Sequence, residues 1–222
     1  EWVSTGGSLV GEFEQKVAGY AGMPAAVACN SGSSGLHLAA LVAGLGVGDE
    51  VIVPSLTFIA AVNPVSRYVG AQPVFIGCDD SLCISPAAVE EFCARRCELR
   101  GGALYNKATG ACVKALVAVH VFGNMADMPA LMDIARRYRL ALIEDATEAL
   151  GTRYTSGPYS GRMAGTIGDV GVYSFNGNKI ITTGAGGMLV SNRPEWAEHA
   201  KHLSTQAKAD ELQFLHDEVG YN

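Results

Sequence analysis

The 222-residue sequence has few charged and few aromatic side chains, which make up 17% and 8% of it. Its lysines and arginines form no cluster and the formal net charge is −6, so a nucleic-acid partner is not expected. No apolar run approaches the roughly 20 residues that cross a bilayer, because the stretch 39–47 is short and contains glycines. The hydrophobic share of 49% is instead enough to bury one large core in a globular protein.

The six cysteines include no Cys-x-x-Cys pair. Cys93 and Cys97 are one helical turn apart, which stacks two thiols without making a zinc knuckle. Others lie in apolar runs, where a thiol behaves as a small hydrophobe. We therefore expect reduced thiols in a cytoplasmic protein. His199 and His202 could share a helix face, but no set of carboxylates or cysteines completes a site with them, so no metal is expected.

Short apolar runs alternate with stretches of helical pattern. Most of the apolar runs are continuous, as in strands covered on both faces, and they lie at 25–29, 50–54, 73–77, 115–120, 141–145, 170–175 and 187–191. Helices are predicted at 8–21, 33–45, 57–69, 85–96, 127–138 and 194–204. This order predicts an α/β sheet with helices on both faces and right-handed crossovers.

Two segments interrupt the alternation. Residues 97–114 contain Gly101, Gly102 and Gly110, and we interpret them as an inserted hairpin or loop on the surface. Residues 152–165 are rich in Gly, Ser and Tyr and have no periodicity, which indicates a loop. Loops that connect predicted strand ends often lie beside active sites.

Lys179 and Asp145 each follow an apolar strand. Lys179 comes after the run 170–175 and precedes a return that ends at Gly184, with no other lysine nearby in sequence. Partial burial of a lone amine suits Schiff-base chemistry, because it favours the neutral nucleophile. Asp145 closes the run 141–145. A lysine for the aldehyde and an acid for the pyridinium nitrogen are the two groups that pyridoxal phosphate (PLP) requires. Taken singly, each residue is better explained without a cofactor, Lys179 as a surface lysine and Asp145 as a helix-capping aspartate.

Two further strand ends carry residues suited to a cofactor. Ser33 and Ser34 open a helix after the first strand, and a helix N-terminus with serine hydroxyls can bind phosphate. The segment is neither a Walker loop nor a dinucleotide fingerprint, and serines there are also ordinary caps. Phe58 follows the second strand and could stack on a flat ring or belong to the core. All these residues fall at carboxyl ends of strands, where open α/β sheets bind ligands.

In this order, the motifs resemble those of the DegT/DnrJ/EryC1/StrS sugar aminotransferases. The resemblance covers essentially the whole chain, and the matching segments are 30–38 (NSGSSGLHL), 53–58 (VPSLTF), 120–123 (HVFG), 143–151 (IEDATEALG) and 174–179 (SFNGNK). It implies fold type I of the PLP enzymes, a three-layer sandwich around a mixed, mostly parallel seven-stranded sheet. The version NGNKIITTG at 176–184 resembles the branch that acts in legionaminate or bacillosamine pathways.

The resemblance implies a role for each matching residue. Lys179 would form the Schiff base with PLP and move the proton, Asp145 would pair with the ring nitrogen, and Phe58 would stack on the ring. Residues that would hold the phosphate are Ser33, Ser34, Ser174 and, from the neighbouring subunit, the asparagine of a Gly-Tyr-Asn motif, here Asn222.

Glu148 departs from the commoner pattern of this family, in which His or Gln stands near the ring hydroxyl. A glutamate there accepts hydrogen bonds unless it carries a proton itself. We expect it to contact the cofactor, although a first-turn glutamate is also stabilised by its helix dipole.

The implied activity is transfer of an amino group, with glutamate as donor, to C4 of a nucleotide-linked 4-keto-6-deoxy amino sugar. Such an enzyme would serve surface polysaccharide or glycan sugar biosynthesis as a cytoplasmic homodimer with shared active sites. One alternative is a sugar dehydratase on the same scaffold, but that branch has histidine in place of Lys179. A PLP-binding sensor without turnover and an α/β binding domain without PLP are the other two.

Members of the family continue beyond the Gly-Tyr-Asn motif with further helices and a small C-terminal domain. This sequence stops at Asn222 and starts with Glu1 rather than methionine. We therefore expect residues 1–222 to be the PLP-binding large domain of a longer protein.

Overall fold

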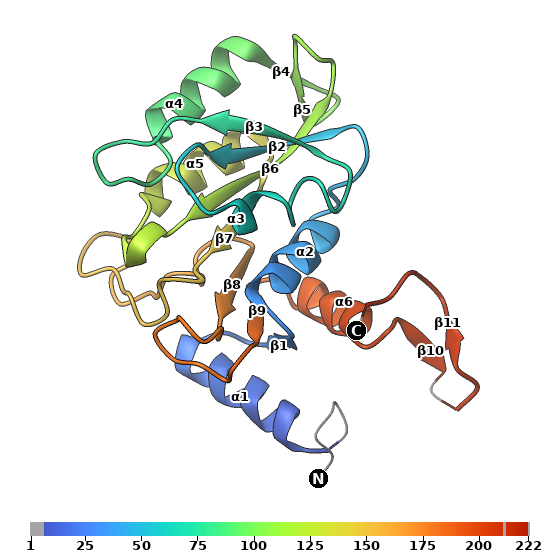
Figure 1. Ribbon diagram of the computed structural model, residues 1–222. Helices are drawn as coiled ribbons and strands as arrows, with labels where there is room; N and C mark the ends of the chain where they lie inside the picture. Colours follow the sequence, from blue (N-terminus) through green and yellow to red (C-terminus); the bar gives the residue numbers. More distant parts are fainter. Residues whose placement is uncertain (1–6, 211, 222) are drawn as a thin grey trace.

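The apolar runs form the strands of one central sheet (Figure 1). The computed structural model describes residues 7–210 and 212–221. In sheet order β1-β9-β8-β7-β6-β2-β3, the strands are β1 (Ala26–Cys29), β9 (Gly187–Ser191), β8 (Val170–Ser174), β7 (Ala141–Asp145), β6 (Cys112–Val119), β2 (Asp49–Pro54) and β3 (Gln72–Ile76). Every residue of β2, β8 and β9 is buried, which explains why these runs are apolar without alternation.

The strands run mostly in one direction. β3, β2, β6, β7 and β8 are parallel to one another, whereas β9 is antiparallel to both β8 and β1. β1 therefore points the same way as β8. The carboxyl ends of all strands on this path except β9 meet at one edge of the sheet, and the predicted mixed, mostly parallel sheet is confirmed.

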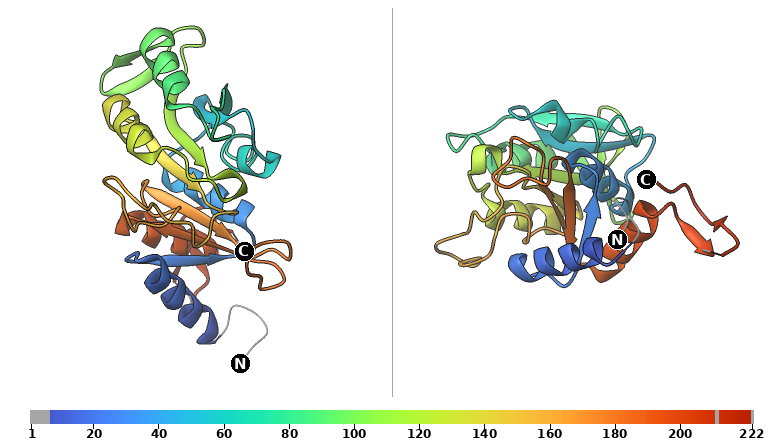
Figure 2. Two further views of the ribbon diagram at one scale, coloured as in Figure 1. Left: turned by 90° about the vertical axis from the view of Figure 1, so that its left-hand side faces the viewer. Right: turned by 60° about the horizontal axis from the view of Figure 1, so that its bottom comes forward.

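Helices cover both faces, so that the sheet is the middle of three layers (Figure 2). Leu189 of β9 packs in one core cluster with Leu36, while its neighbour Met188 packs on the opposite face with Val17. The helices are α1 (Leu9–Ala21), α2 (Gly32–Val42), α3 (Ile59–Val62), α4 (Pro86–Glu91), α5 (Met128–Tyr138) and α6 (Pro194–Ser204), with a 3₁₀ turn η2 (Val121–Gly123). α6 lies beside α2, and α5 packs against β6 and β7.

One predicted helix is wrong in length, and another has the predicted range but changes form along it. The helix expected at 57–69 is only α3, and turns follow it as far as Gly70. Pro64 has no N–H to continue the helical ladder, and the helix ends at Val62, two residues before it. The helix expected at 85–96 begins on the Ser85 cap, then widens into a π-helical turn, η1 (Phe92–Arg96).

The segment 97–114 forms a hairpin, as one of the two predicted forms, but it also enlarges the sheet. β4 (Cys97–Arg100) and β5 (Ala103–Asn106) pair with each other, and β5 pairs with β6, so nine strands are hydrogen-bonded together. The buried carboxylate of Glu50 anchors the hairpin, since it accepts hydrogen bonds from Asn106 Nδ2 at 2.8 Å and Thr109 Oγ1 at 2.7 Å. A separate ribbon of β10 (Lys208–Asp210) and β11 (Leu215–His216) extends away from the sheet (Figures 1 and 2).

All six cysteines are free, as expected. Burial raises the pKa of Cys29 and of Cys93 to about 12, so these thiols are unreactive packing groups. Among the described residues, no helix combines the length and apolar character that crossing a membrane requires.

Gly171 in β8 provides a stability test of this packing. A Cβ on Gly171 would lie 1.9 Å from Gly165 O, and the loop that holds Gly165 is itself tied to Glu144 through Gly165 N at 2.8 Å. We predict that Gly171→Ala lowers the unfolding free energy by about 3 kcal/mol or more, because backbone must shift. Gly19→Ala, in α1 with open space around it, should instead raise it by about 0.5–1 kcal/mol. Urea unfolding of both variants is the measurement, and a Gly171→Ala protein as stable as the parent would contradict the packing described.

Candidate active site

The carboxyl edge of the sheet borders a cavity of about 350 Å³. Turns after β1, β2, β6, β7 and β8 all contribute to it. Its polar lining consists of Ser31, Ser33, Thr57, His120, Asp145, Thr147, Glu148, Ser174, Asn176, Asn178 and Lys179. Of the predicted site residues, the structure brings Lys179, Asp145, Phe58, Glu148, Ser33 and Ser174 together here.

The N-terminus of α2 opens into the cavity through Ser33 rather than Ser34. Ser31 is the N-cap, and its Oγ accepts the N–H of Ser34 at 3.1 Å. The Ser34 hydroxyl donates to Asn30 Oδ1 at 2.5 Å, and Ser34 lines a second cavity beside His37 instead. Adjacent residues on a helix point about 100° apart, so a serine pair at a helix start presents only one hydroxyl to one site.

Two observations show that this corner of the cavity suits an anion. Thr57 Oγ1 is buried and has no hydrogen-bond partner among the described residues, and Thr57 lines the cavity. At Gly32, a Cβ would lie 3.0 Å from both Ser174 Cβ and Thr147 Cγ2, so the glycine allows Ser174 to pack closely against the helix start. Together with the positive end of the α2 dipole, a hydroxyl without a partner and a serine beside the helix start fit a phosphate.

Asp145 ends β7 with its side chain almost wholly buried, at 4% exposure. Burial raises the pKa of Asp145, while hydrogen bonds from Thr147, one of them from Thr147 N to Oδ1 at 3.0 Å, and the charge of Lys179 oppose that rise. The net effect is a raised pKa of Asp145, so the positive charges of the protein alone do not compensate for the burial of its carboxylate. A cationic group in the cavity would supply that compensation.

Lys179 follows β8 on a turn in which its N–H donates to Asn176 O at 3.0 Å. Its Nζ lies 5.9 Å from the centroid of the Phe58 ring and 3.6 Å from Glu148 Oε1. The Lys179 and Glu148 side chains are 17% and 23% exposed, so the pair is largely shielded from water. Phe58 is itself 59% exposed, and it presents its ring to the cavity rather than to the core.

Glu148 also holds the turn after β6. Its second oxygen, Oε2, accepts the N–H of Phe122 at 3.0 Å. Phe122 has φ 56°, a left-handed conformation that a non-glycine residue adopts at a cost, and this hydrogen bond helps to stabilise it. One carboxylate therefore connects Lys179 with the η2 turn.

Sequence reasoning missed the buried pair formed by His120 and Glu144. His120 Nε2 and Glu144 Oε2 are 2.8 Å apart with both side chains fully buried, and Ala126 N donates to His120 Nδ1 at 3.2 Å. Nδ1 thus accepts, so in the neutral ring the proton lies on Nε2 and is donated to Glu144. Burial opposes ionisation of Glu144, but the hydrogen bond from His120, together with the N–H groups of Gly168 and Gly165, lowers its pKa.

The available signal for this pair was weak. Glu144 and Asp145 are adjacent acids, and only the period of two in a strand separates one that faces the cavity from one that does not. Thr57, Asn176 and Asn178 were within the motifs but had no role assigned to them. Asn222, predicted to reach a partner's phosphate site, lies outside the described residues.

Comparison with known proteins gives a consistent match. The model of the DegT/DnrJ/EryC1/StrS aminotransferase family matches residues 1–222. The chain is similar to GDP-perosamine synthase of Caulobacter vibrioides, with 40% identity over 221 residues, 100% of this chain and 54% of that protein. GDP-perosamine synthase of Escherichia coli O157:H7 is 37% identical over 222 residues, 100% of this chain and 55% of that protein.

A solved structure, a DegT DnrJ EryC1 StrS aminotransferase from Brucella abortus, is similar with a TM-score of 0.85 and 32% identity. The match covers 97% of this chain and 54% of that one. The chain thus spans about half the length of the curated relatives and of this solved structure.

The burial of Asp145 has a consequence for the stability of the cofactor-free protein. Its folded pKa is raised above the ordinary value of 3.8, so ionised Asp145 destabilises the fold at neutral pH, and the effect vanishes below that value. We predict that cofactor-free Asp145→Asn is more stable than the parent at pH 7 by about 1–2 kcal/mol, the scale of an undercompensated buried polar group. The difference should shrink as the pH falls towards 4, in thermal unfolding followed across pH. Asp133→Asn, on the exposed face of α5, is the control and should change nothing; an Asp145→Asn protein less stable than the parent at pH 7 would contradict the argument.

Proposed function

The chain belongs to the DegT/DnrJ/EryC1/StrS aminotransferase family, and from that premise we propose that the protein is a PLP-dependent sugar aminotransferase. The observation that supports it most is one cavity at the carboxyl edge of the sheet. That cavity contains a shielded lysine amine, a buried carboxylate and the N-terminus of α2. These groups are the ones that PLP requires of a protein.

The residues present fit the cofactor part by part. Ser33, Thr57 and Ser174 would bind the phosphate with the positive end of the α2 dipole, and Ser34 would act only through the cap. Asp145 would face the ring nitrogen. The positive charge of that nitrogen would stabilise the buried carboxylate, whose pKa burial raises. The Phe58 ring would form one wall of the ring pocket and exclude water from it. Bound PLP would supply an aldehyde that condenses with amines and a ring that accepts electrons.

The chain's own residues would then position charges and protons. Lys179 Nζ is the amine of the cavity, and it would also move the proton as general acid and base. Asp145, kept from water, would stabilise positive charge beside it more strongly than an exposed acid could. Glu148 would hold Lys179 through the 3.6 Å ion pair and fix its orientation relative to the η2 turn.

The proposed substrates are an amino-acid donor, glutamate, and a nucleotide-linked keto sugar. Two relatives named GDP-perosamine synthase support a nucleotide-linked acceptor. Action at C4 of a 4-keto-6-deoxy amino sugar, of the legionaminate or bacillosamine type, remains a prediction from the motif at 176–184. So does a cytoplasmic homodimer in which Asn222 reaches the partner's phosphate site.

Transfer of the amino group from glutamate tests the proposal. With PLP and glutamate, the parent protein should release 2-oxoglutarate and lose the aldehyde absorbance of PLP. Lys179→Ala should lower the rate by at least about 1,000-fold, because the amine that holds the cofactor and moves the proton is gone. Lys16→Ala, an exposed lysine in α1, should leave it unchanged. Equal rates in both variants would exclude Lys179 as the active amine.

Two substitutions of Glu148 separate its two contacts. Glu148→Gln keeps an acceptor for Phe122 N–H but loses the charge beside Lys179, so we predict unchanged thermal stability and a transamination rate at least about tenfold lower. Glu148→Ala loses both contacts and should in addition lower the melting temperature, since the strained η2 turn loses its support. A Gln variant with the parent's rate would show that the ion pair has no part in turnover.

A further inference from the structure

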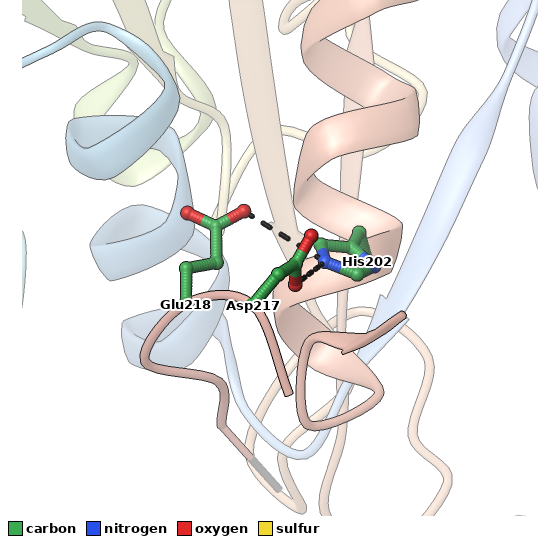
Figure 3. A group of neighbouring side chains, drawn as sticks. All are labelled: His202, Asp217 and Glu218. Atoms are coloured by element: carbon green, nitrogen blue, oxygen red, sulfur yellow. Dashed lines mark hydrogen bonds and ion pairs between the residues drawn. The ribbon is translucent and has the colours of Figure 1, made fainter. Parts of the chain in front are cut away.

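A cluster of possible metal ligands lies on α6, away from the PLP cavity. His199 and His202 are three residues apart and share a helix face. The segment after β11 brings Asp217 and Glu218 to that face, and Figure 3 shows both carboxylates directed toward the His202 ring. Sequence reasoning found the histidines but not these partners, because a ribbon and its turn separate them along the chain.

The spacing of the ligand atoms is close to that of a zinc site. His202 Nε2 lies 2.7 Å from Asp217 Oδ1 and 3.8 Å from Glu218 Oε1, and one ligand atom from each of these residues lies within 4.8 Å of the others. His199 Nε2 lies 2.9 Å from Glu218 Oε1. In a tetrahedral site with bonds of about 2.0–2.1 Å, neighbouring ligand atoms are about 3.3 Å apart. The distances from His202 Nε2 to the two carboxylates bracket this value. His199 lies outside the group whose ligand atoms are all within 4.8 Å of one another, so its side chain would have to turn toward His202 to become the fourth ligand.

The backbone holds the carboxylates in place independently of those side chains. Asp217 N donates to Ala207 O at 3.3 Å, Tyr221 N to Leu203 O at 2.7 Å, and Gln206 N to Tyr221 O at 3.1 Å. The two ends of the segment 206–221, residues 206–207 and 217–221, therefore lie against the end of α6 before any metal binds. His202 is 28% exposed, and Asp217 and Glu218 are 56% and 41% exposed, so an ion can enter from solvent.

We propose that His199, His202, Asp217 and Glu218 form a Zn²⁺ site that fastens the segment 217–221 to α6. Two imidazoles with two carboxylates suit zinc, whereas Mg²⁺ and Ca²⁺ prefer an all-oxygen set. In the structure, each imidazole Nε2 faces a carboxylate oxygen and shares a proton with it. Zinc would bind both atoms and displace that proton. The inference is independent of the proposed aminotransferase activity.

The proposed zinc site would also affect the neighbouring helix α2. Tyr221, at the end of the fastened segment, packs edge-on against His37 of α2 with ring centroids 4.9 Å apart. α2 is the helix whose N-terminus opens into the PLP cavity. Zinc bound at α6 would thus fix the segment that leads to Asn222.

The test is zinc binding by the PLP-loaded protein, measured by competition with a chromophoric chelator. The parent should bind one Zn²⁺ per chain with an affinity that His202→Ala lowers at least about tenfold, since even residues that only orient a ligand are worth about 10–100-fold. Asp217→Asn should lower it comparably. His216→Ala, beside the fastened segment but bonded to Gln206 O, and Glu198→Gln on α6 are the controls and should bind as the parent does.

Cleavage by trypsin after Lys208 gives a second readout. Zn²⁺ should slow this cut in the parent and in both control variants, and Mg²⁺ should have no effect. In His202→Ala and Asp217→Asn, Zn²⁺ should give no protection. Zinc binding that is absent in the parent, or equal in the parent and His202→Ala, overturns the proposal, because any remaining zinc would then lie on other groups such as the free thiols.

Discussion

The fully buried carboxylate of Glu144 is the contact on which the arrangement of the active site depends. It receives hydrogen bonds from His120 Nε2 and Gly165 N, both at 2.8 Å, and from Ile167 N at 2.6 Å and Gly168 N at 2.5 Å. These donors come from the turn after β6 and from the loop that enters β8, so one side chain of β7 ties three neighbouring strands together. A buried carboxylate that loses such partners costs about 3–5 kcal/mol, which makes the network a strong constraint. Asp145, the next residue, and the chain that leads to Lys179 take their positions from it.

Some polar groups of the site find all their hydrogen-bond and charge partners within the protein, and others do not. Glu144 has its full set of donors, whereas burial raises the pKa of Asp145 and Thr57 Oγ1 has no partner in the described part of the chain. Both incompletely satisfied groups face the cavity. A protein gains nothing from such groups by itself, so they indicate a bound molecule with a cation at one end and hydrogen-bond acceptors at the other. A pyridinium ring that carries a phosphate has this character.

Much of the fold could be predicted from the sequence, because strands buried on both faces are continuous apolar runs and their carboxyl ends share an edge. Lys179, Asp145 and Phe58 were predicted on that basis together with the family resemblance, and the structure gathers them in one cavity. Other features depend on the direction of a single side chain or on distant pairing. The choice of Ser33 over Ser34, the Glu148 bridge and the pairing of His202 with Asp217 are of this kind. The short α3 could have been predicted, since Pro64 stood within the proposed helix.

The central claim is that Lys179 is the amine that binds the cofactor, and chemical trapping tests it most directly. The protein would be loaded with PLP, reduced with borohydride, digested and mapped by mass spectrometry. We expect the reduced phosphopyridoxyl group on the peptide that contains Lys179. The label on Lys201 or Lys208 with none on Lys179, or no label at all after loading with PLP, would contradict this claim.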